Sequence, residues 1–490
     1  MKISDYVARF RTPAFMHQLA DAQSLIDNES FGLLNEMGTG KSKSVIDAAC
    51  VLHLEDEIDR VVVIAPASVR SVWLNPDFGE IKKHCWRPAN AMEFHSKGLR
   101  TAHEIEIPGS DERPLPWVVT NYEYIRPRKN RDRLIEIIRK GRTMLVLDES
   151  AFIKSPTAVQ TKACLELSDL AVRRVILNGT PITHSPLDLW SQMRFLDEKI
   201  LPYANFYAFR ATFAVVDTRY GFPKILRFQN LDRLQRHVAP YVVRREKRDC
   251  LDLPEKIYSQ IEVPLDAKSW SVYKKMREEA VVWLDENPSL AAQAGVRVLR
   301  LAQITSGFLG GFDDDPKVKP IGTEKLDALT ERVEAWIEEN PKLKLIVWAR
   351  FRREIESVAK ALKKLLPTYV LYGEQSKDDR EEAIRVFSGD DVKGPALLAA
   401  QPQAGGFGLN LVAASTVVYL SNDFNLGTRL QSEDRVHRPG QSRNVLYFDV
   451  IATGPTGQKT VDHTVVKALR EKSEIASWTA SAWKAALKEE

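Results

Sequence analysis

The strongest restriction on the fold is a series of short apolar runs, rich in β-branched residues, each followed by a turn or a helical pattern. Runs this apolar are typical of strands buried on both faces, as in a parallel sheet that helices cover. They form two series, at 61–64, 117–119, 144–147 and 175–177, and at 345–348, 396–399, 417–420 and 445–448. Two such series predict two α/β lobes, and a chain of 490 residues is too long for a single core.

Between the two series, from about residue 190 to 320, the pattern becomes helical, aromatic and charged. Helices are predicted at 267–286 and 289–306. A further helix is predicted over the tail from 461 to 487, with Val465, Leu469, Trp478 and Trp483 at its packing positions.

The composition excludes several classes of protein. A hydrophobic content of 44% and a charged content of 28% are typical of an ordinary globular protein. No run approaches ~18 apolar residues, so no membrane span is predicted, and the charged N-terminus lacks the apolar core of a signal peptide. The four cysteines form no C-x-x-C pair, which favours reduced thiols in a cytoplasmic, intracellular setting over a disulfide or zinc site.

A glycine-rich loop at 36–42 lies between a predicted strand at 31–34 and a predicted helix at 43–54, the context that a phosphate-binding loop requires. Glycines here let backbone N–H groups turn towards phosphate oxygens, and the helix N-terminus adds partial positive charge. Lys41 is expected to reach the β- and γ-phosphates, and the Ser42 hydroxyl to bind Mg²⁺. Asn35 stands where a standard loop has its first glycine. The predicted ATP-binding residues of the loop are Gly38, Thr39, Gly40, Lys41 and Ser42.

Two acids, Asp148 and Glu149, end the apolar run at 144–147. Paired carboxylates at a strand end, in a chain that also has a phosphate loop, divide the work of phosphoryl transfer. Asp148 is expected to hold Mg²⁺ together with Ser42, and Glu149 to polarise the attacking water.

Arg435 and Arg438 follow a helix-like run and lie three residues apart, which predicts that they share one helix face. Arginines that approach a transferring phosphate accelerate hydrolysis by ~10³–10⁵. Because almost 400 residues separate them from the phosphate loop, only a closed two-lobed fold could bring both to one nucleotide. The alternative is a surface face of ion pairs.

Taken in order, these motifs resemble those of Swi/Snf-type ATPases of helicase superfamily 2. The phosphate loop resembles motif I, Asp148-Glu149 motif II, 178–182 motif III, 405–411 motif V, and 431–438 motif VI. The resemblance implies two RecA-like parallel-sheet lobes, helical insertions between them and a C-terminal helical brace. We expect lobe 1 at 1–190, the insertions and inter-lobe segment at 191–320, lobe 2 at 321–455 and the brace at 456–490.

The resemblance also assigns roles to single residues. It implies that Gln18 reads the adenine, that Gly408 and Asn410 contribute to the nucleotide site, and that Gln431 acts with Arg435 and Arg438. Arg244-Arg245 before Leu253-Pro254 resembles the family's inter-lobe segment. One departure concerns the histidine that usually stands two residues after the catalytic glutamate, because here Ser150-Ala151 follow Glu149. The sequence therefore does not identify the residues that couple hydrolysis to nucleic acid.

We predict an ATP- and Mg²⁺-dependent motor, stimulated by DNA, that translocates along duplex DNA and remodels DNA or protein–DNA structures without base-sequence specificity. Two clusters of eight basic residues, at 126–142 and 342–364, suit contact with the DNA backbone, although either could be a solvated helix face. The expected location is cytoplasmic and intracellular, and nucleoid-associated if the source is a bacterium or a phage. The alternatives are an RNA or single-strand helicase on the same fold and a nucleotide-dependent binding scaffold with little turnover.

Overall fold

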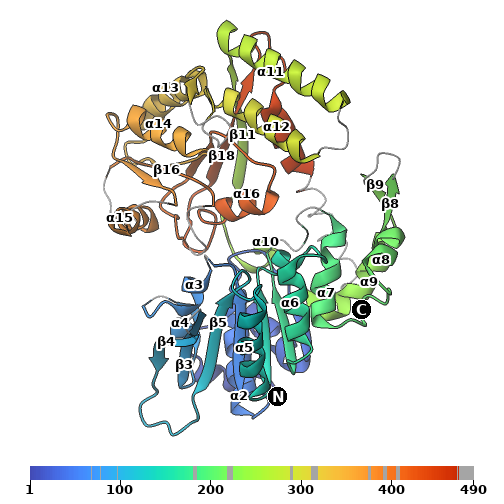
Figure 1. Cartoon of the computed structure of the whole chain (residues 1–490). Coiled ribbons are helices and arrows are strands. Elements are labelled where there is room, and N and C mark those ends of the chain that lie inside the picture. The colour runs from blue at the N-terminus through green and yellow to red at the C-terminus, as the bar shows by residue number, and fades with distance from the viewer. Residues whose placement is uncertain are drawn as a thin grey trace. The chain divides into compact units, whose positions relative to one another are not determined.

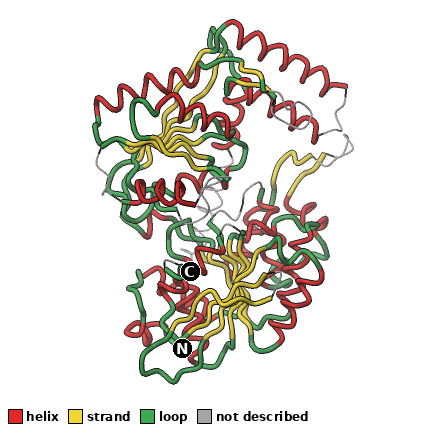
Figure 2. Tube along the Cα trace, turned by 60° about the vertical axis from the view of Figure 1, so that its left-hand side comes forward, coloured by secondary structure: helices red, strands yellow, loops and turns green. Residues whose placement is uncertain are grey.

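The structure, a computed structural model, describes the chain apart from 68, 78, 96–97, 180–181, 183–184, 218–223, 287–290, 311–317, 374–376, 390–393, 404–408, 472 and 474–490. It divides into two compact units. Unit 1 comprises Met1–Val216 and Ile225–Asp252, and unit 2 comprises Asp217–Lys224 and Leu253–Glu474. Each unit has its own parallel sheet with helices on both sides (Figures 1 and 2).

The sheet of unit 1 has eight described strands in the order β10-β1-β7-β6-β2-β5-β3-β4. All neighbours are parallel except the β3–β4 pair at one edge. The strands are β1 (Ser30–Leu33), β2 (Arg60–Ala65), β3 (Ala89–His95), β4 (Gly98–Ile105), β5 (Leu115–Asn121), β6 (Thr143–Asp148), β7 (Arg173–Leu177) and β10 (Val242–Val243).

Helices follow most of these strands, and a two-stranded ribbon lies outside the sheet. Apolar residues of the central strands, such as Val62 and Leu145, share one buried cluster with residues of α5, α6 and α7. The helices are η1 (Ile3–Arg9), α1 (Met16–Asp27), α2 (Lys41–Leu54), α3 (Arg70–Leu74), α4 (Glu80–His84), α5 (Arg128–Arg139), η2 (Ser150–Ile153), α6 (Val159–Ser168), η3 (Pro186–Asp188), α7 (Leu189–Leu196), α8 (Phe206–Phe213), α9 (Leu231–Val238), η4 (Ala239–Tyr241) and α10 (Lys247–Cys250). The ribbon is β8 (Ala214–Asp217) with β9 (Lys224–Phe228).

The sheet of unit 2 is parallel throughout its six described strands, in the order β11-β18-β17-β14-β16-β15. Successive residues of β14 enter different clusters: Ile346 and Trp348 pack on one face, Leu345 and Val347 on the other. This alternation shows a sheet buried on both faces, as the apolar runs predicted. The strands are β11 (Lys256–Pro264), β14 (Lys344–Trp348), β15 (Thr368–Leu371), β16 (Ala396–Ala400), β17 (Thr416–Tyr419) and β18 (Val445–Thr453).

Helices cover this sheet or extend from it, and a short strand pair lies beside them. They are α11 (Ala267–Glu286), α12 (Ala291–Thr305), α13 (Glu324–Glu339), α14 (Arg352–Leu362), α15 (Lys377–Ser388) and α16 (Leu426–Glu433), with the strand pair β12 (Phe308–Leu309) and β13 (Lys319–Pro320). Residues 461–471 are also helical. Val465 and Leu469 are buried there, as predicted, whereas Trp478 and Trp483 lie outside the described residues.

The predicted fold class, α/β with two parallel-sheet lobes, is confirmed, and all eight apolar runs form strands. The sequence pattern missed several edge strands. β11 is the clearest, since most of its residues are exposed and polar residues interrupt its apolar ones, so that it carries no apolar run. It nevertheless pairs with β18 over nine residues, so the segment between the two series contributes a strand to a sheet as well as helices. In the described part of the chain, no helix combines the length and hydropathy needed to cross a bilayer.

Candidate active site

The phosphate loop joins the end of β1 to the start of α2. Gly38 and Gly40 have φ values of 81° and 86°, in the left-handed region that glycine adopts without strain. Gly40 has a second restriction, because a Cβ there would lie 2.1 Å from the amide nitrogen of Gln18. Both features turn the loop backbone sharply before α2 and leave Lys41 and Ser42 at the helix N-terminus.

Lys41 lies over the loop that precedes it. Its Nζ donates to the carbonyl oxygens of Asn35 (2.7 Å) and Glu36 (3.1 Å). The Thr39 hydroxyl donates to the same Glu36 carbonyl at 2.9 Å, so that a hydrogen bond within the loop also stabilises its turn. An ammonium group above a ring of loop backbone is the arrangement that binds phosphate oxygens.

Gln18 packs against the loop from α1 and is only 6% exposed. Its amide nitrogen donates to the Thr39 carbonyl at 3.0 Å, and its amide oxygen accepts from the Phe15 backbone at 3.1 Å. The ring of His17 reaches the same Thr39 carbonyl at 2.8 Å. Gln18 therefore holds the phosphate loop in place, and its predicted role in reading adenine stays a prediction.

Asp148 ends β6 and is held by two donors. The indole nitrogen of Trp73 donates to one carboxylate oxygen at 2.8 Å, and the backbone nitrogen of Glu149 donates to the other at 2.9 Å. Burial raises the pKa of Asp148, while the Trp73 hydrogen bond and the positive charge of Lys41 lower it. The positive charge of Lys41 is therefore near enough to act on this carboxylate.

Glu149 has a left-handed backbone, with φ of 52°. Non-glycine residues rarely adopt this region, and such strain is concentrated at active sites. The conformation turns the chain directly into η2 and leaves the Glu149 side chain half-exposed just beyond the carboxyl end of β6. A base that polarises water needs this combination of a fixed backbone and an accessible carboxylate.

The oxygen groups present fit the predicted Mg²⁺. A serine hydroxyl at the start of α2 and a carboxylate fixed at the end of β6 are hard oxygen donors, which Mg²⁺ prefers in company with phosphate oxygens. Ser42 and Asp148 would hold the ion, and Gly38–Lys41 would hold the phosphates.

Ser150, which follows Glu149, enters a buried amide network that sequence reasoning missed. Its hydroxyl donates to the Gln192 side-chain oxygen at 2.7 Å, and the Asn178 amide lies 3.4 Å from that same oxygen. Gln192 also donates to the Asp188 carbonyl at 2.9 Å. The end of β6 is thereby connected to the end of β7 and to α7. The only signal in the sequence was the position of Asn178 in the motif III-like segment.

In unit 2 the predicted arginines do not share a helix face. Helix α16 ends at Glu433, so Gln431 lies on the helix while Arg435 and Arg438 lie in the turns that follow. The prediction was wrong because the backbone leaves the helix there: Leu411 N donates to the Arg435 carbonyl at 2.9 Å. Arg435 is 8% exposed and its guanidinium lies 5.3 Å from the Trp348 ring centroid.

Arg438 is half-buried, and its Nη1 donates to the Leu409 carbonyl at 3.1 Å. Both arginines therefore contact the segment around 409–411, which includes Asn410. The structure thus brings the motif V-like and motif VI-like segments together within unit 2. Gly408, the other residue predicted in the motif V-like segment, lies outside the described residues.

Buried charges anchor the end of α16. Arg429 pairs with Glu433 at 2.8 Å and with Asp449 of β18, and its guanidinium lies 3.5 Å from the Tyr419 ring centroid. Glu433 also accepts from Lys256 of β11 at 3.1 Å. Burial raises the pKa of Glu433, but the Lys256 and Arg429 charges outweigh it and lower the value to about 2. Glu433 is therefore ionised and fully paired at neutral pH.

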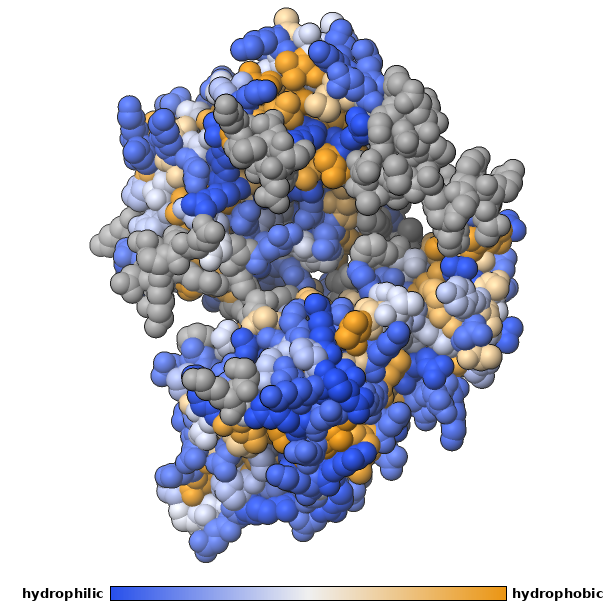
Figure 3. All heavy atoms as spheres, in the orientation of Figure 1, coloured by the Kyte–Doolittle hydropathy of each residue, from blue (hydrophilic) through white to orange (hydrophobic). Residues whose placement is uncertain are grey.

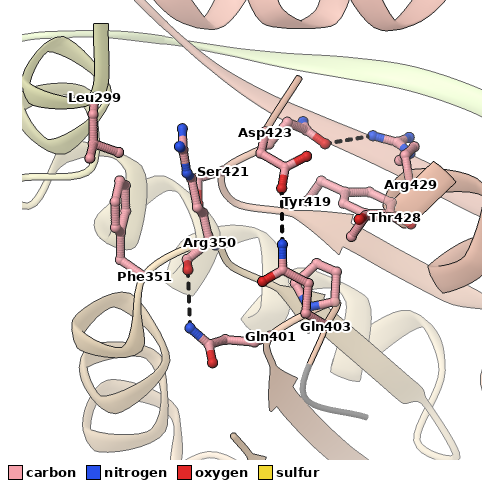
Figure 4. Close-up of a pocket in the computed structure, with 12 residues that line it drawn as sticks. Leu299, Arg350, Phe351, Gln401, Gln403, Tyr419, Ser421, Asp423, Thr428 and Arg429 are labelled. Atoms are coloured by element: carbon pink, nitrogen blue, oxygen red, sulfur yellow. Dashed lines mark hydrogen bonds between the residues drawn. The ribbon is translucent and has the colours of Figure 1, made fainter. Parts of the chain in front are cut away.

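A cavity of about 290 Å³ opens in unit 2 at the carboxyl ends of β14, β16 and β17 (Figure 4). Ligands of open α/β sheets bind at this edge. Arg350 lines the cavity, and its backbone carbonyl accepts from Gln401 at 3.1 Å. Gln403 donates to Asp423 at 3.2 Å across the same opening. Arg350 is the member of the 342–364 cluster that faces this cavity.

The two basic clusters are partly structural. In unit 1, Arg128 and Arg131 both pair with Glu166 at 2.7 Å, and Arg142 pairs with Asp59 at 3.2 Å. In unit 2, Lys344 is buried and Arg352 pairs with Glu356 at 2.9 Å. Figure 3 shows that hydrophilic residues dominate the face of unit 1 over α5 and α6. The exposed basic residues of the clusters are Arg126, Arg128, Lys129, Arg139, Lys140, Arg142, Lys342, Arg352, Arg353, Lys360, Lys363 and Lys364.

Comparison with known proteins finds two family matches that together span most of the chain. Residues 17–303 match the SNF2-related domain, and residues 324–440 match the helicase conserved C-terminal domain. The first match includes the phosphate loop and Asp148-Glu149, and the second ends just after Arg438.

Curated relatives include bacterial and yeast proteins. An uncharacterized ATP-dependent helicase of Mycoplasma pneumoniae is 26% identical over 93% of this chain and 41% of its own length. The putative ATP-dependent helicase/translocase YwqA of Bacillus subtilis is 27% identical over 87% of this chain and 44% of its own. The transcription regulatory protein SNF2 of Saccharomyces cerevisiae is 24% identical over 91% of this chain and 26% of its own. The chain thus spans less than half the length of these relatives.

Among solved structures, the Sulfolobus solfataricus SWI2/SNF2 ATPase core in complex with dsDNA aligns with 98% of this chain and 97% of its own. The sequence identity is 23% and the TM-score is 0.43.

Proposed function

Because this chain belongs to the SNF2-related family, we propose that it is an ATP-hydrolysing motor that moves along duplex DNA and displaces or remodels what is bound there. The observation that carries the proposal is that one chain contains both a phosphate loop, in one α/β unit, and an arginine segment, in a second α/β unit. A chain built only to bind nucleotide would need the first of these but not the second.

The residues of unit 1 bind and orient the nucleotide. Lys41 leaves the Asn35 and Glu36 carbonyls to bind the β- and γ-phosphates, while Gln18 holds the loop through Thr39. Bound Mg²⁺, held by Ser42 and Asp148, would neutralise phosphate charge. Glu149 accepts the proton of the attacking water.

The residues of unit 2 act on the charge that develops at the γ-phosphate. Arg435 and Arg438 are positioned by the 409–411 segment and, in turn, by the charge network around Glu433. Hydrolysis then depends on both units. A nucleotide can favour the closed state of the two units over the open state only if it binds the closed state more tightly.

The DNA contacts are non-specific. Exposed basic residues of both clusters neutralise backbone phosphates, which gives affinity without sequence preference. Arg350 extends this surface into the cavity at the carboxyl edge of the unit 2 sheet. A motor that moves along DNA would lie in the cytoplasm, at the nucleoid if the source is a bacterium or a phage.

Two measurements test the proposal. ATP turnover is measured with duplex DNA, single-stranded DNA or RNA, and duplex DNA should stimulate it most. Displacement of a third strand from a triplex by the ATP-driven enzyme should require a duplex in front of the triplex. Stimulation by RNA alone, or turnover without displacement of the third strand, would contradict movement along duplex DNA.

A further inference from the structure

The segment that leaves unit 1 runs alongside the phosphate loop. β10 pairs with β1 in parallel, with Val242 opposite Gly32. Beyond the strand pair the contact continues, since Glu36 N donates to the Arg245 carbonyl at 2.9 Å and Lys247 N donates to the Glu36 carboxylate at 2.8 Å. Residues 242–247 therefore follow the backbone of the loop from its first residue.

Side-chain contacts around the buried residues Asn35 and Asp21 reinforce this contact. The Asn35 amide donates to one oxygen of Asp21 at 2.6 Å, and Arg245 Nε donates to the other at 2.8 Å. Asn35 and Asp21 are 0% and 1% exposed. The Asn35 carbonyl in turn accepts from Lys41 at 2.7 Å. A continuous path of contacts thus connects the lysine of the phosphate loop to Arg245.

This path explains the residue that departs from the standard loop. A glycine at position 35 could offer only its backbone, whereas the asparagine side chain reaches the carboxylate that Arg245 also binds. Asp21 lies between them as a buried acid with one partner on each oxygen.

The same segment is anchored a few residues later in unit 2. The Pro254 carbonyl lies 2.6 Å from His437 Nε2, between Arg435 and Arg438 in the sequence. Lys256 and Tyr258 both bond the Glu433 carboxylate, at 3.1 and 2.7 Å. The chain therefore runs from contacts with the phosphate loop to contacts with the arginine segment, with only 248–253 between the two sets.

We propose that residues 242–258 form a strap that transmits the state of the phosphate loop to the arginine segment, with Arg245 as the positioning residue at its nucleotide end. When phosphate draws Lys41 away from the Asn35 carbonyl, Asn35, Asp21 and Arg245 adjust together and shift the start of the strap. The inference rests on the proposed function, because a motor needs such transmission.

A double-mutant cycle tests the path itself. Arg245→Met and Asp21→Asn keep shape and remove the ion pair, and Arg248→Met is the control, since Arg248 lies on the same segment but is largely exposed and pairs with Glu246. Removing a hydrogen bond to a charged group should weaken nucleotide affinity about 10-fold. The two changes together should weaken it no more than either alone, with Arg248→Met unchanged.

Transmission is measured with fluorescent probes at exposed positions of each unit, Val159 and Leu365. At saturating nucleotide, the change in probe distance seen in the wild type should shrink in Arg245→Met and persist in Arg248→Met. A purely structural role would lower the melting temperature but leave that change intact. If Arg245→Met does not stay folded, Arg245→Lys replaces it, and we then expect a smaller decrease in both nucleotide affinity and the change in probe distance.

Additive effects in the cycle, or an Arg245→Met that behaves like Arg248→Met in both assays, would overturn the proposal. A wild type whose probe distance ignores nucleotide would instead contradict the motor function, and the cycle on nucleotide affinity would then decide the role of Arg245 on its own.

Discussion

At the residue scale, the chemistry of the phosphate site depends on which donors hold each buried acid. Asp148 keeps both oxygens occupied, one by the Trp73 indole and one by the Glu149 backbone. Two fixed donors select one rotamer of the carboxylate. Trp73 is itself immobile, because it is fully buried and stacks on Trp117 with ring centroids 6.3 Å apart.

Replacing Trp73 with phenylalanine should lower the affinity for the Mg²⁺ that supports nucleotide binding, while preserving the packing on Trp117. Losing one hydrogen bond to a charged group corresponds to about a 10-fold higher Mg²⁺ concentration at half-saturation. A titration of Mg²⁺ at fixed fluorescent nucleotide measures it. Trp117→Phe is the matched control, and an equal effect in that variant would show that packing, rather than the hydrogen bond, matters.

Glu149→Gln should abolish turnover and leave nucleotide binding in place. The amide cannot accept the proton of the attacking water, so we expect a loss of about 10²–10⁴ in the rate of hydrolysis. Single-turnover hydrolysis and equilibrium binding, measured on the same sample, separate the two effects. An unchanged displacement activity in this variant would favour the low-turnover scaffold over the motor.

The residues that we expect to carry the chemistry could be proposed from the sequence because each motif is local: a loop of a few residues between strand and helix, or two acids at a strand end. The side chains that hold them could not. Trp73, Gln192 and Asp21 reach the site from other elements, and nothing in the spacing of the sequence connects Trp73 to Asp148 across 75 residues. Their contribution appears only when the sheet brings the strand ends together.

At the scale of elements, strands buried on both faces were predictable because a short run that is apolar at every residue rarely occurs outside a covered sheet. Exposed edge strands such as β11 lack such a run. The end of a helix is also hard to locate from the sequence. The clear helix-stop residues in the sequence, Pro439-Gly440, come only after Arg438, whereas α16 already ends at Glu433. Tertiary hydrogen bonds to the 409–411 segment and the buried charges around Glu433 determine where the helix stops.

Arg429→Met should therefore destabilise unit 2. It leaves the buried Glu433 and Asp449 carboxylates without their shared partner, and breaking a buried pair costs about 3–5 kcal/mol. Denaturant unfolding followed in the full chain should show an earlier transition for unit 2. Arg352→Met, which breaks an exposed pair with Glu356, is the control and should change stability by about 0.5 kcal/mol or less.

Helix α2 should lose stability as the pH falls, because of His53 in its last turn. The ring is buried, and neither nitrogen has a hydrogen-bond partner among the residues that the structure describes. Burial, with the charges of Arg87 and Arg113, lowers the pKa of His53 to about 4. The unfolded chain binds this proton near pH 6.5, so stability is full above that pH and falls towards pH 4.

His53→Leu should remove that part of the pH dependence. Between pH 7 and pH 5 the wild type should lose about 1–2 kcal/mol more than the variant. Urea unfolding at both pH values gives the difference. A variant that loses as much stability as the wild type would place the acid sensitivity on other groups.

At the scale of the whole molecule, the division of labour between the units decides what each substitution can reveal. Nucleotide binding is expected to rest on Lys41 and its loop in unit 1, whereas the arginines belong to unit 2. A change in unit 2 should therefore leave nucleotide affinity almost intact and still stop hydrolysis. A protein that used only one unit for catalysis would not show this separation.

Of the two arginines, Arg438 gives the clearer test by replacement with alanine. Arg435 is buried against Trp348, so that its truncation would also disturb packing. Arg438 is half-buried, and its side chain donates to the Leu409 carbonyl. Loss of an arginine that stabilises the transferring phosphate should lower turnover about 10³-fold or more, with nucleotide affinity changed by less than about 3-fold. Arg385→Ala, on the exposed face of α15, is the control and should match the wild type. If Arg438→Ala hydrolysed ATP at the wild-type rate, catalysis would belong to unit 1 alone, and the arginine segment would need another purpose.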